Sequence, residues 1–242
     1  MTSSPHHSLI VPLYNEAGNI LPLLEAAVPV LASFPGEFEI ILVDDGSADA
    51  TPDEIRAAAA RWPQLRALRH AQNRGQAAAL LTGLHAARGE LIFTMDGDGQ
   101  NDPRDFPLLY TPVAAGAFDV MCGWRVDRHD NLIRRFMSRL GNFVRRLVLD
   151  DHLHDAGCQL RVFRREVISA LFPIELMQSF LPSIAHAAGF RVGEIPVRHH
   201  PRRQGHAKFG LRQLWWRPFI AMLRVRRHLR TLPHRPPAEN HL

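Results

Sequence analysis

The chain has 242 residues, and 46% of them are hydrophobic, which is enough to bury a sizeable core. Only Cys122 and Cys158 are cysteines, so a disulfide framework is excluded; each is expected to be a small core residue in a reducing compartment. Residues 1–120 carry 7 basic and 15 acidic side chains, a net charge of −8, whereas residues 121–242 carry a net charge of +13. This asymmetry predicts a cation site in the first half and an anionic partner for the second.

The sequence carries no recognisable signal for export or membrane insertion. The first residues, MTSSPHHS, lack the basic and apolar regions of a signal peptide. No uncharged apolar run reaches the ~18 residues that suggest a transmembrane helix. The nearest candidate, Val167–Phe190, contains Pro173, Glu175 and Pro182 and is interpreted as two separate segments. We therefore expect neither a signal peptide nor a transmembrane helix.

The first half alternates between apolar runs typical of buried strands and segments with helical periodicity. Strands are predicted at 9–11, 38–43, 65–70, 90–96 and 118–124, and helices at 15–34, 51–62, 75–89 and 103–116. Asn15 and Thr51 are expected to cap the first two helices, with Pro52 at the first position of the second. Gly89 is expected to end the third. This alternation predicts an α/β fold with a mostly parallel sheet covered by helices on both faces.

Short polar clusters follow four of these predicted strands. They read YNE at 14–16, DDGS at 44–47, DGDGQ at 96–100 and GWR at 123–125. In a parallel sheet the carboxyl ends of the strands share one edge, and ligands bind beyond that edge. The sequence therefore predicts that the four clusters contribute to one site.

The run FTMDGDGQNDP places three carboxylates, those of Asp96, Asp98 and Asp102, directly after a buried strand. Like charges repel one another and lose hydration when they are partly buried, so a bound cation is the simplest explanation. Carboxylate oxygens suit Mg²⁺ or Mn²⁺. Two carboxylates do not fill six coordination positions, so such an ion would bridge to phosphate oxygens.

Three other interpretations of this acidic run fit the sequence less well. An EF-hand loop counted from Asp96 needs Gly at its sixth position and Glu at its twelfth, where Asn101 and Pro107 stand. A phosphatase of the haloacid dehalogenase type would place the motif after an early strand, whereas here it follows the fourth. A dinucleotide-binding fold needs a Gly-rich turn after the first strand, where this chain reads PLYNE.

The second half is basic and contains two amphipathic segments, 131–148 and 211–230, in which Arg residues accompany apolar side chains. Such helices either lie on an anionic membrane or pack their apolar face on the protein core, and both alternatives stay open here. The other expected features are a turn, a short strand and a helix at 154–171, a strand at 190–200, a basic loop at 201–210 and a disordered tail at 231–242.

The combination of motifs is more specific than any one of them. VPLYNEAGNI, ILVDDGSADAT, QNRGQAAALLTGLHAARGE and FTMDGDGQNDP, in this order and spacing, resemble the family-two glycosyltransferases with the GT-A fold. The later GWRVDRHD, RRFMSRLGN, DAGCQLRVFRRE and FLPSIAHAAGFRVGEIPVRHHPRRQGHAKF resemble one branch, the polyprenyl-phosphate (dolichyl-phosphate) mannosyl- and glucosyltransferases. The resemblance runs from about Ser8 to Phe209.

The resemblance implies roles for the matching residues on the nucleotide side. Asp96 would face the ribose or the sugar, and Asp98 and Gln100 would hold Mg²⁺ or Mn²⁺ against the donor diphosphate. The residues that would line the nucleotide base and ribose are Pro12, Tyr14, Glu16, Asp44 and Asp45.

It also implies that basic residues gather the donor diphosphate and the acceptor phosphate. These are Arg125, Arg134, Arg202 and Lys208, of which Lys208 is the only lysine in a chain with 28 arginines. Lysine binds phosphate as a compact point charge, which distinguishes it from arginine. Together with Asp96 and Asp98, Arg125 and Lys208 are the candidate catalytic residues.

A phosphate acceptor would also explain why no general base is obvious in the sequence. A lipid phosphate is already ionised at neutral pH, so its oxygen needs no strong base. Asp155 is instead a candidate for positioning an arginine. Two local departures concern the acceptor side: the branch usually has Ser or Thr, Gly and Phe where this chain has Ala156, Gly157 and Cys158, and Ser, Lys and Tyr where it has AKF at 207–209.

We therefore expect one GT-A catalytic domain at 1–230, with a nucleotide-sugar and metal half at 1–124, an acceptor half at 125–210 and an amphipathic helix at 211–230. The expected reaction is inverting transfer of a sugar from a UDP- or GDP-hexose to a polyprenyl phosphate. The expected location is the cytoplasmic face of the membrane, bound peripherally, with no nucleic-acid partner. The alternatives are a soluble-sugar or glycolipid acceptor, and a non-catalytic membrane- or nucleic-acid-binding module. The sugar, nucleotide, lipid length and oligomeric state stay open.

Overall fold

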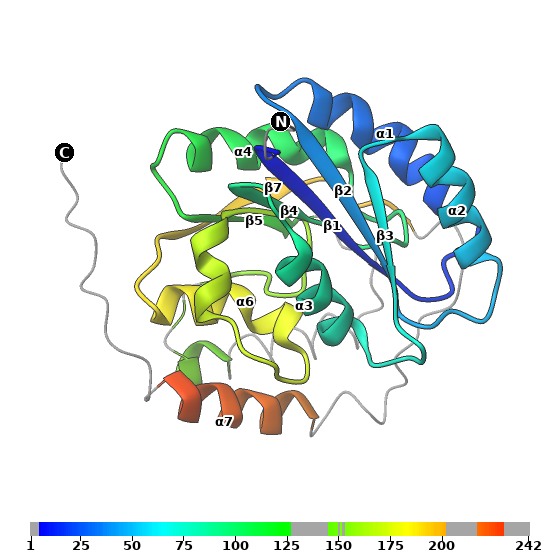
Figure 1. Ribbon diagram of the computed structural model, residues 1–242. Coiled ribbons are helices and arrows are strands. Elements are labelled where there is room, and N and C mark those ends of the chain that lie inside the picture. The colour runs from blue at the N-terminus through cyan, green and yellow to red at the C-terminus, as the bar shows by residue number, and fades with distance from the viewer. Residues whose placement is uncertain (1–4, 127–144, 150, 152, 202–216, 230–242) are drawn as a thin grey trace.

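A seven-stranded sheet forms the centre of the computed structural model, which describes residues 5–126, 145–149, 151, 153–201 and 217–229 (Figure 1). The order across the sheet is β3-β2-β1-β4-β6-β5-β7, and only β6 runs antiparallel to its neighbours. The mostly parallel α/β sheet predicted from the sequence is therefore confirmed. The strands are β1 His7–Leu13, β2 Phe38–Asp44, β3 Leu65–Arg69, β4 Leu91–Thr94, β5 Val120–Arg125, β6 Arg161–Arg164 and β7 Val192–Val197.

Helices cover both faces of the sheet, because the central strands are apolar on both sides. In β1, Leu9 and Val11 join one hydrophobic core, whereas Ile10 joins the other. The first core includes side chains of α1 Ile20–Ala32, α2 Thr51–Arg61 and α4 Phe106–Ala114. The second includes side chains of α3 Gln76–Ala86, α6 Met177–Ala187 and α7 Arg217–Leu229. Figure 1 shows these two groups of helices on opposite sides of the sheet.

The antiparallel strand β6 separates β4 from β5, although those two strands are successive in the first half of the chain. Because β6 runs in the opposite direction, its first residue lies at the edge where its neighbours end: Arg161 pairs with Thr94 of β4 and with Cys122 of β5. A basic side chain from the second half of the chain therefore enters the edge at which the polar clusters gather. Cys122 and Cys158 are both buried, as expected of core residues.

Two predicted helix caps are wrong, because their side chains bond to a neighbouring loop instead. Helix α1 begins at Ile20, and the Asn15 side chain accepts a hydrogen bond from Ala48 N at 2.9 Å. Thr51 is the first residue of α2, and its hydroxyl accepts a hydrogen bond from Glu16 N at 2.8 Å. These bonds connect the loop after β1 to the loop after β2, so they hold two of the predicted polar clusters together.

Gly89 does not end α3, which stops at Ala86. Its backbone N–H donates to Ser8 Oγ at 2.8 Å, and a Cβ at this position would lie 2.6 Å from the His7 carbonyl carbon. A glycine is needed there because the chain passes against β1, so packing rather than helix termination explains it.

The remaining predicted elements are found with small changes. The segment at 103–116 forms a short 3₁₀ helix, η1 Pro103–Asp105, followed by α4. After β6 the chain forms a second 3₁₀ helix, η2 Arg165–Ala170, where an ordinary helix was expected. The helix predicted at 131–148 lies outside the described residues except for 145–149, which are helical. The basic loop after 201 and the tail at 231–242 also lie outside them. Within the described parts of the chain, no helix combines the length and apolarity needed to cross a bilayer.

Candidate active site

A cavity of about 1090 Å³ opens at the carboxyl ends of β1, β2 and β4. Pro12, Tyr14 and Glu16 reach it from the end of β1, and Asp45 from the end of β2. The acidic run after β4 contributes residues 96–98, and the start of α3 and residues 173–178 close the other sides. Three of the four predicted polar clusters therefore meet in one place, as expected for strands that end at one edge, whereas no residue of the fourth, GWR at 123–125, lines this cavity.

Asp96 is half-buried at the cavity wall and lies beside a second carboxylate, that of Asp98. Burial and, after it, the negative charge of Asp98 together raise the pKa of Asp96 to about 7, although Arg125 and Arg161 oppose the shift. Gln76 of α3 donates a hydrogen bond to Asp96 Oδ1 at 2.7 Å. The two neighbouring carboxylates therefore repel each other, and a bound cation would relieve that repulsion.

The backbone of the acidic run is held close to β1. A Cβ on Gly97 would lie 2.3 Å from Leu13 Cδ2, so with a larger residue either the Leu13 side chain or the run would have to shift. Asp98 Oδ1 accepts a hydrogen bond from Gln100 N at 3.1 Å, and Asn101 Oδ1 accepts one from Asp96 N at 3.0 Å. Local bonds therefore fix the direction of the carboxylates independently of any ligand.

The residues around Asp98 fit a divalent cation that is completed by a ligand. Within the described residues, no cluster of three or more His, Cys, Asp and Glu side chains could hold an ion alone. Two carboxylates would leave further positions for phosphate oxygens. Gln100 is less well placed for this task, because its side-chain nitrogen lies 3.4 Å from His200 O and its side chain is absent from the cavity lining.

Asp45 is fastened by three hydrogen bonds. Its Oδ1 accepts from His70 Nδ1 at 2.7 Å and from Arg74 N at 2.9 Å, and its Oδ2 accepts from Gly75 N at 2.7 Å. The adjacent Asp44 is buried outside the cavity lining, where it accepts from Ser47 N at 2.9 Å. Of this acidic pair, only Asp45 faces the cavity, and it also positions the turn that begins α3.

Arg125 lies at the end of β5 and is bound to Asp155. Its Nε and one terminal nitrogen donate to the two Asp155 carboxylate oxygens at 2.7 and 2.9 Å. Burial opposes the positive charge, but the hydrogen bonds and charge of Asp155 raise the pKa of Arg125 above its usual range. Arg125 is also near enough to Asp96 for the two charges to stabilise each other. Asp155 therefore positions an arginine, as the sequence suggested.

The other three predicted basic residues, Arg134, Arg202 and Lys208, lie outside the described residues. Sequence reasoning missed two groups that the fold brings to the site. Gln76 contacts Asp96 directly, and Gln178 of α6 donates to Gln76 at 3.3 Å. Arg161 is fully buried and donates to the carbonyl oxygens of Ala156 and Gln178 at 2.9 and 2.6 Å. Only the antiparallel course of β6 brings it there, and no local motif signals that course.

Comparisons with known proteins agree with this geometry. The chain is 39% identical over 210 residues to a dodecaprenyl-phosphate galacturonate synthase of Rhizobium johnstonii, covering 84% of this chain and 62% of that protein. It is 36% identical over 209 residues to an undecaprenyl-phosphate 4-deoxy-4-formamido-L-arabinose transferase of Edwardsiella ictaluri, covering 86% and 64%. The chain thus spans less than two thirds of the length of these curated relatives.

Solved structures share the fold at lower identity. A glucosyl-3-phosphoglycerate synthase from Mycobacterium tuberculosis superposes with a TM-score of 0.67 and 19% identity over 95% of this chain and 81% of that one. A mannosyltransferase from Pyrobaculum calidifontis, in complex with GDP-Man and Mn²⁺, superposes with a TM-score of 0.64 and 23% identity over 98% and 67%. The fold is GT-A-like, and residues 8–172 match the family described as Glycosyl transferase family 2. The chain belongs to glycosyl transferase family 2.

Proposed function

We propose that this protein is an inverting glycosyltransferase that moves a sugar from a UDP- or GDP-hexose to a polyprenyl phosphate. The observation that carries the proposal is the single cavity that joins Asp96 and Asp98 to Pro12, Tyr14, Glu16 and Asp45. The two curated relatives are named for polyprenyl-phosphate products or acceptors, which supports the acceptor class. Transfer would invert the anomeric carbon, because one acceptor oxygen attacks as the nucleoside diphosphate leaves.

Mg²⁺ or Mn²⁺ is the proposed cofactor. Asp98 would hold it with Gln100, whose side chain must turn away from His200 to do so, and Asp96 would face the ribose or the sugar. When bound, the ion would neutralise the negative charge that develops on the leaving diphosphate. The Pyrobaculum mannosyltransferase structure contains Mn²⁺ with its nucleotide sugar, and a Mycobacterium tuberculosis structure contains Mn²⁺ with UDP-glucose, which supports a divalent ion in this fold.

The chain's own residues would bind and orient both substrates. Pro12, Tyr14, Glu16 and Asp45 would hold the nucleotide, and Asp44 would act behind them by fixing the turn after β2. Arg125 would attract phosphate oxygens next to Asp96, and Arg134, Arg202 and Lys208 would join it. A cation that is already held in position, as Arg125 is by Asp155, stabilises charge in the transition state without rearrangement.

The state of Asp155 favours a phosphate acceptor over a soluble-sugar acceptor. A sugar-hydroxyl acceptor would need a carboxylate or another group to act as general base, and Asp155 is the carboxylate next to Arg125 that could be tested for that role. Both Asp155 oxygens accept hydrogen bonds from Arg125, so this carboxylate is engaged in an ion pair. An ionised lipid phosphate needs no such base.

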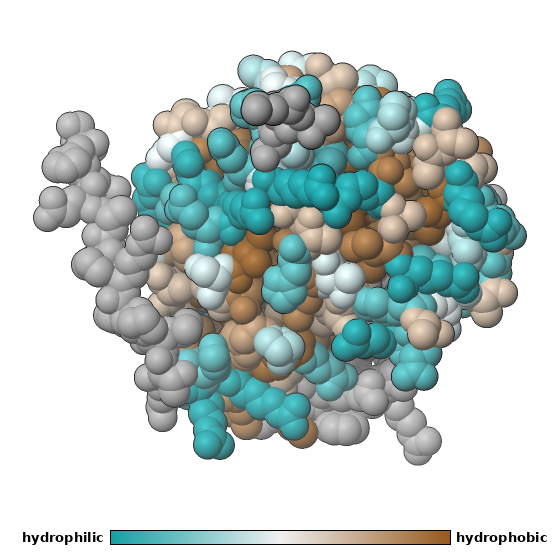
Figure 2. Space-filling model, in the orientation of Figure 1, coloured by the Kyte–Doolittle hydropathy of each residue, from teal (hydrophilic) through white to brown (hydrophobic). Residues whose placement is uncertain are grey.

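We also propose peripheral contact with the cytoplasmic membrane through α7. Ala221, Met222 and Val225 of α7 are buried against the protein, whereas Ile220 and Leu223 are 40% and 44% exposed. Arginines 224, 226 and 227 follow on the same helix, and Figure 2 shows apolar residues between hydrophilic ones along the lower edge, where α7 lies in Figure 1. An exposed apolar ridge flanked by arginines suits an anionic lipid surface.

The test is a transfer assay with a panel of UDP- and GDP-sugars, a short polyprenyl phosphate and Mg²⁺ or Mn²⁺. We expect a lipid-linked sugar that disappears when EDTA is added. Release of nucleotide without lipid product would move the acceptor to a soluble sugar or a glycolipid. If the folded protein neither binds nor consumes any donor but binds nucleic acid or membrane with a steep salt dependence, the non-catalytic alternative holds.

A further inference from the structure

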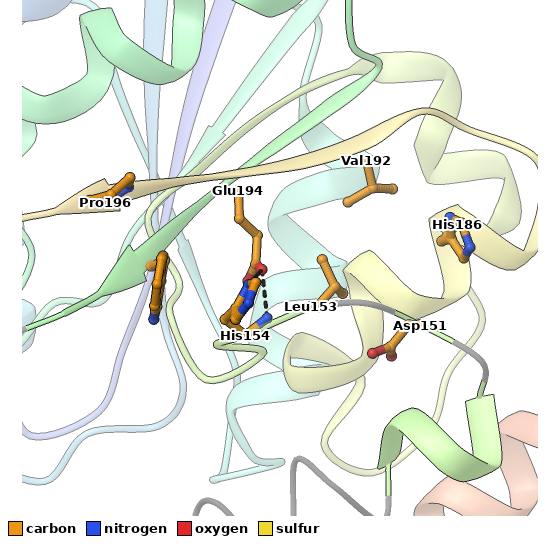
Figure 3. A pocket seen from close by; sticks show the side chains of 8 residues that line it. Asp151, Leu153, His154, His186, Val192, Glu194 and Pro196 are labelled. Atoms are coloured by element: carbon orange, nitrogen blue, oxygen red, sulfur yellow. Dashed lines mark hydrogen bonds and ion pairs between the residues drawn. The ribbon is translucent and has the colours of Figure 1, made fainter.

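Another carboxylate, that of Glu194, lies behind the Arg125–Asp155 ion pair. Glu194 lies in β7, which pairs in parallel with β5, and it faces the segment around His154 (Figure 3). Its side chain is 8% exposed. None of the roles discussed so far uses it.

Glu194 binds two successive backbone N–H groups. Its Oε1 accepts from Asp155 N at 3.0 Å, and its Oε2 accepts from His154 N at 2.5 Å. The His154 ring also lies at hydrogen-bond distance, with Nδ1 3.0 Å from Oε2. Charged acceptors make strong bonds to backbone N–H groups. The Glu194 carboxylate therefore holds the backbone at both His154 and Asp155.

Those two bonds hold the backbone that carries the Asp155 carboxylate, whose Oδ1 also accepts a hydrogen bond from Gly157 N at 3.1 Å. Residues 153–160 form neither helix nor strand, so no regular ladder holds this segment. Asp155 in turn receives three bonds from Arg125, through Nε, one terminal nitrogen and the backbone N–H. The side chains of Arg125 and Asp155 are 14% and 5% exposed, so their geometry leaves little freedom.

Side-chain packing supports this segment only in part. A second cavity, of about 340 Å³, lies between it and β7 and is lined by Leu153, His154, Val192 and Glu194 among others (Figure 3). The Trp124 ring stacks on the His154 ring, with centroids 4.6 Å apart, along one wall. Because space remains on the β7 side of the segment, the hydrogen bonds to Glu194 supply support there that close packing does not.

We propose that Glu194 is a positioning residue for Arg125. By holding the two N–H groups it orients Asp155, and Asp155 then directs the Arg125 guanidinium toward the phosphates beside Asp96. The last step, in which Arg125 binds phosphate, rests on the proposed function. The chain of contacts from Glu194 to Arg125 does not depend on it.

A double-mutant cycle tests the transfer role. Glu194→Ala should lower kcat/KM for sugar transfer about 30-fold in the wild-type background but less than about two-fold in an Arg125→Ala background, because the two residues act through one contact. A merely structural residue would lower the rate by the same factor in both backgrounds, and that result would overturn the proposal. Glu194→Gln keeps the side-chain volume and one acceptor oxygen, so its kcat/KM should lie between those of the wild type and Glu194→Ala. It replaces Glu194→Ala in the cycle if the alanine variant does not fold.

The matched control is His154→Ala, which removes the ring but keeps both backbone N–H donors. It should transfer within about two-fold of the wild-type rate, since the two backbone bonds persist. A loss as large as that of Glu194→Ala would assign the effect to the ring and refute the backbone clamp.

A second measurement tests the positioning role without relying on transfer activity. It therefore remains informative if the wild-type protein transfers nothing to polyprenyl phosphate, which would refute the proposed function. The Arg125 Nε–H should give a slowly exchanging ¹⁵N NMR signal, identified by its absence in Arg125→Ala. Glu194→Ala should broaden or remove that signal, while His154→Ala should preserve it. An unchanged signal in Glu194→Ala would overturn the positioning role.

Discussion

The two sides of the candidate site are built differently. On the nucleotide side, carboxylates receive hydrogen bonds from backbone N–H groups of nearby loops, as Asp45 does from Arg74 and Gly75. On the side of β5 and β7, an ion pair joins two side chains that lie 30 residues apart in the chain, Arg125 at the end of β5 and Asp155 in the irregular segment before β6. Backbone partners survive most side-chain substitutions, whereas a side-chain pair fails when either member changes. The positions of the carboxylates on the proposed nucleotide side should therefore tolerate substitution of their neighbours, whereas a single substitution can break the Arg125–Asp155 pair on the proposed acceptor side.

The largest expected effect lies on the nucleotide side. Asp98→Ala should lower transfer by about 10³-fold, because the charge on the leaving diphosphate would lose its proposed counter-ion site. Donor binding measured by calorimetry should lose its dependence on Mg²⁺ or Mn²⁺. Asp53→Asn, which removes an exposed carboxylate paired with Arg56, is the control and should leave both values unchanged. Metal-dependent binding that persists in Asp98→Ala would contradict the assignment.

The next effect separates the two sides from each other. Lys208→Ala should lower transfer by about 10²-fold while the fold is retained, because a point charge for phosphate is lost and the strand-end carboxylates remain. Lys208→Arg should recover part of the rate, since it restores charge but not geometry. Circular dichroism and the transfer assay measure the two properties separately. Full transfer by Lys208→Ala would remove this residue from the proposed mechanism.

A smaller effect is expected at the membrane. The double variant Ile220→Asp with Leu223→Asp should lower partitioning onto anionic vesicles about tenfold, because it places charge on the exposed apolar ridge of α7. Leu108→Asp is a matched control, since Leu108 is 48% exposed on α4, which covers the opposite face of the sheet. Vesicle co-sedimentation measures both. Equal losses in the two variants would show that α7 is not the contact surface.

The last expected effect concerns stability rather than transfer and should leave both sides of the site intact. Burial opposes the charge of Glu39, but hydrogen bonds from Arg66, Ser8 and Arg88 N hold its pKa below the ordinary value of about 4.5. Its stabilising contribution is therefore complete above that value and is lost as the pH falls through the lower folded-state pKa. Glu39→Gln should lower the free energy of unfolding by about 2 kcal/mol at pH 7, and by progressively less in acid. Denaturant titrations across this range measure it, and a pH-independent difference would contradict the charge argument.

Predictions that depend on local sequence patterns succeeded, whereas those that depend on the choice of a hydrogen-bond partner failed. Periodic apolar runs identified the strands and helices of the first half, because burial of both sheet faces demands such runs. The helix caps failed because Asn15 and Thr51 each had a second possible partner in a neighbouring loop, and the tertiary contact won. The identity of the residue before a helix does not reveal which of two partners it will take.

By itself, the sequence determined the α/β class, the family and the placement of carboxylates after β1, β2 and β4. These properties depend on local runs and on the rule that parallel strands end at one edge. Only the tertiary structure decided that β6 lies antiparallel between β4 and β5 and that Glu194 holds the segment carrying Asp155. It also decided that Gln76 bonds to Asp96 and that Arg161 lies near enough to lower the pKa of Asp96. Those contacts join residues far apart in the chain, and strand order is set by how both faces of the sheet pack, which no local pattern records.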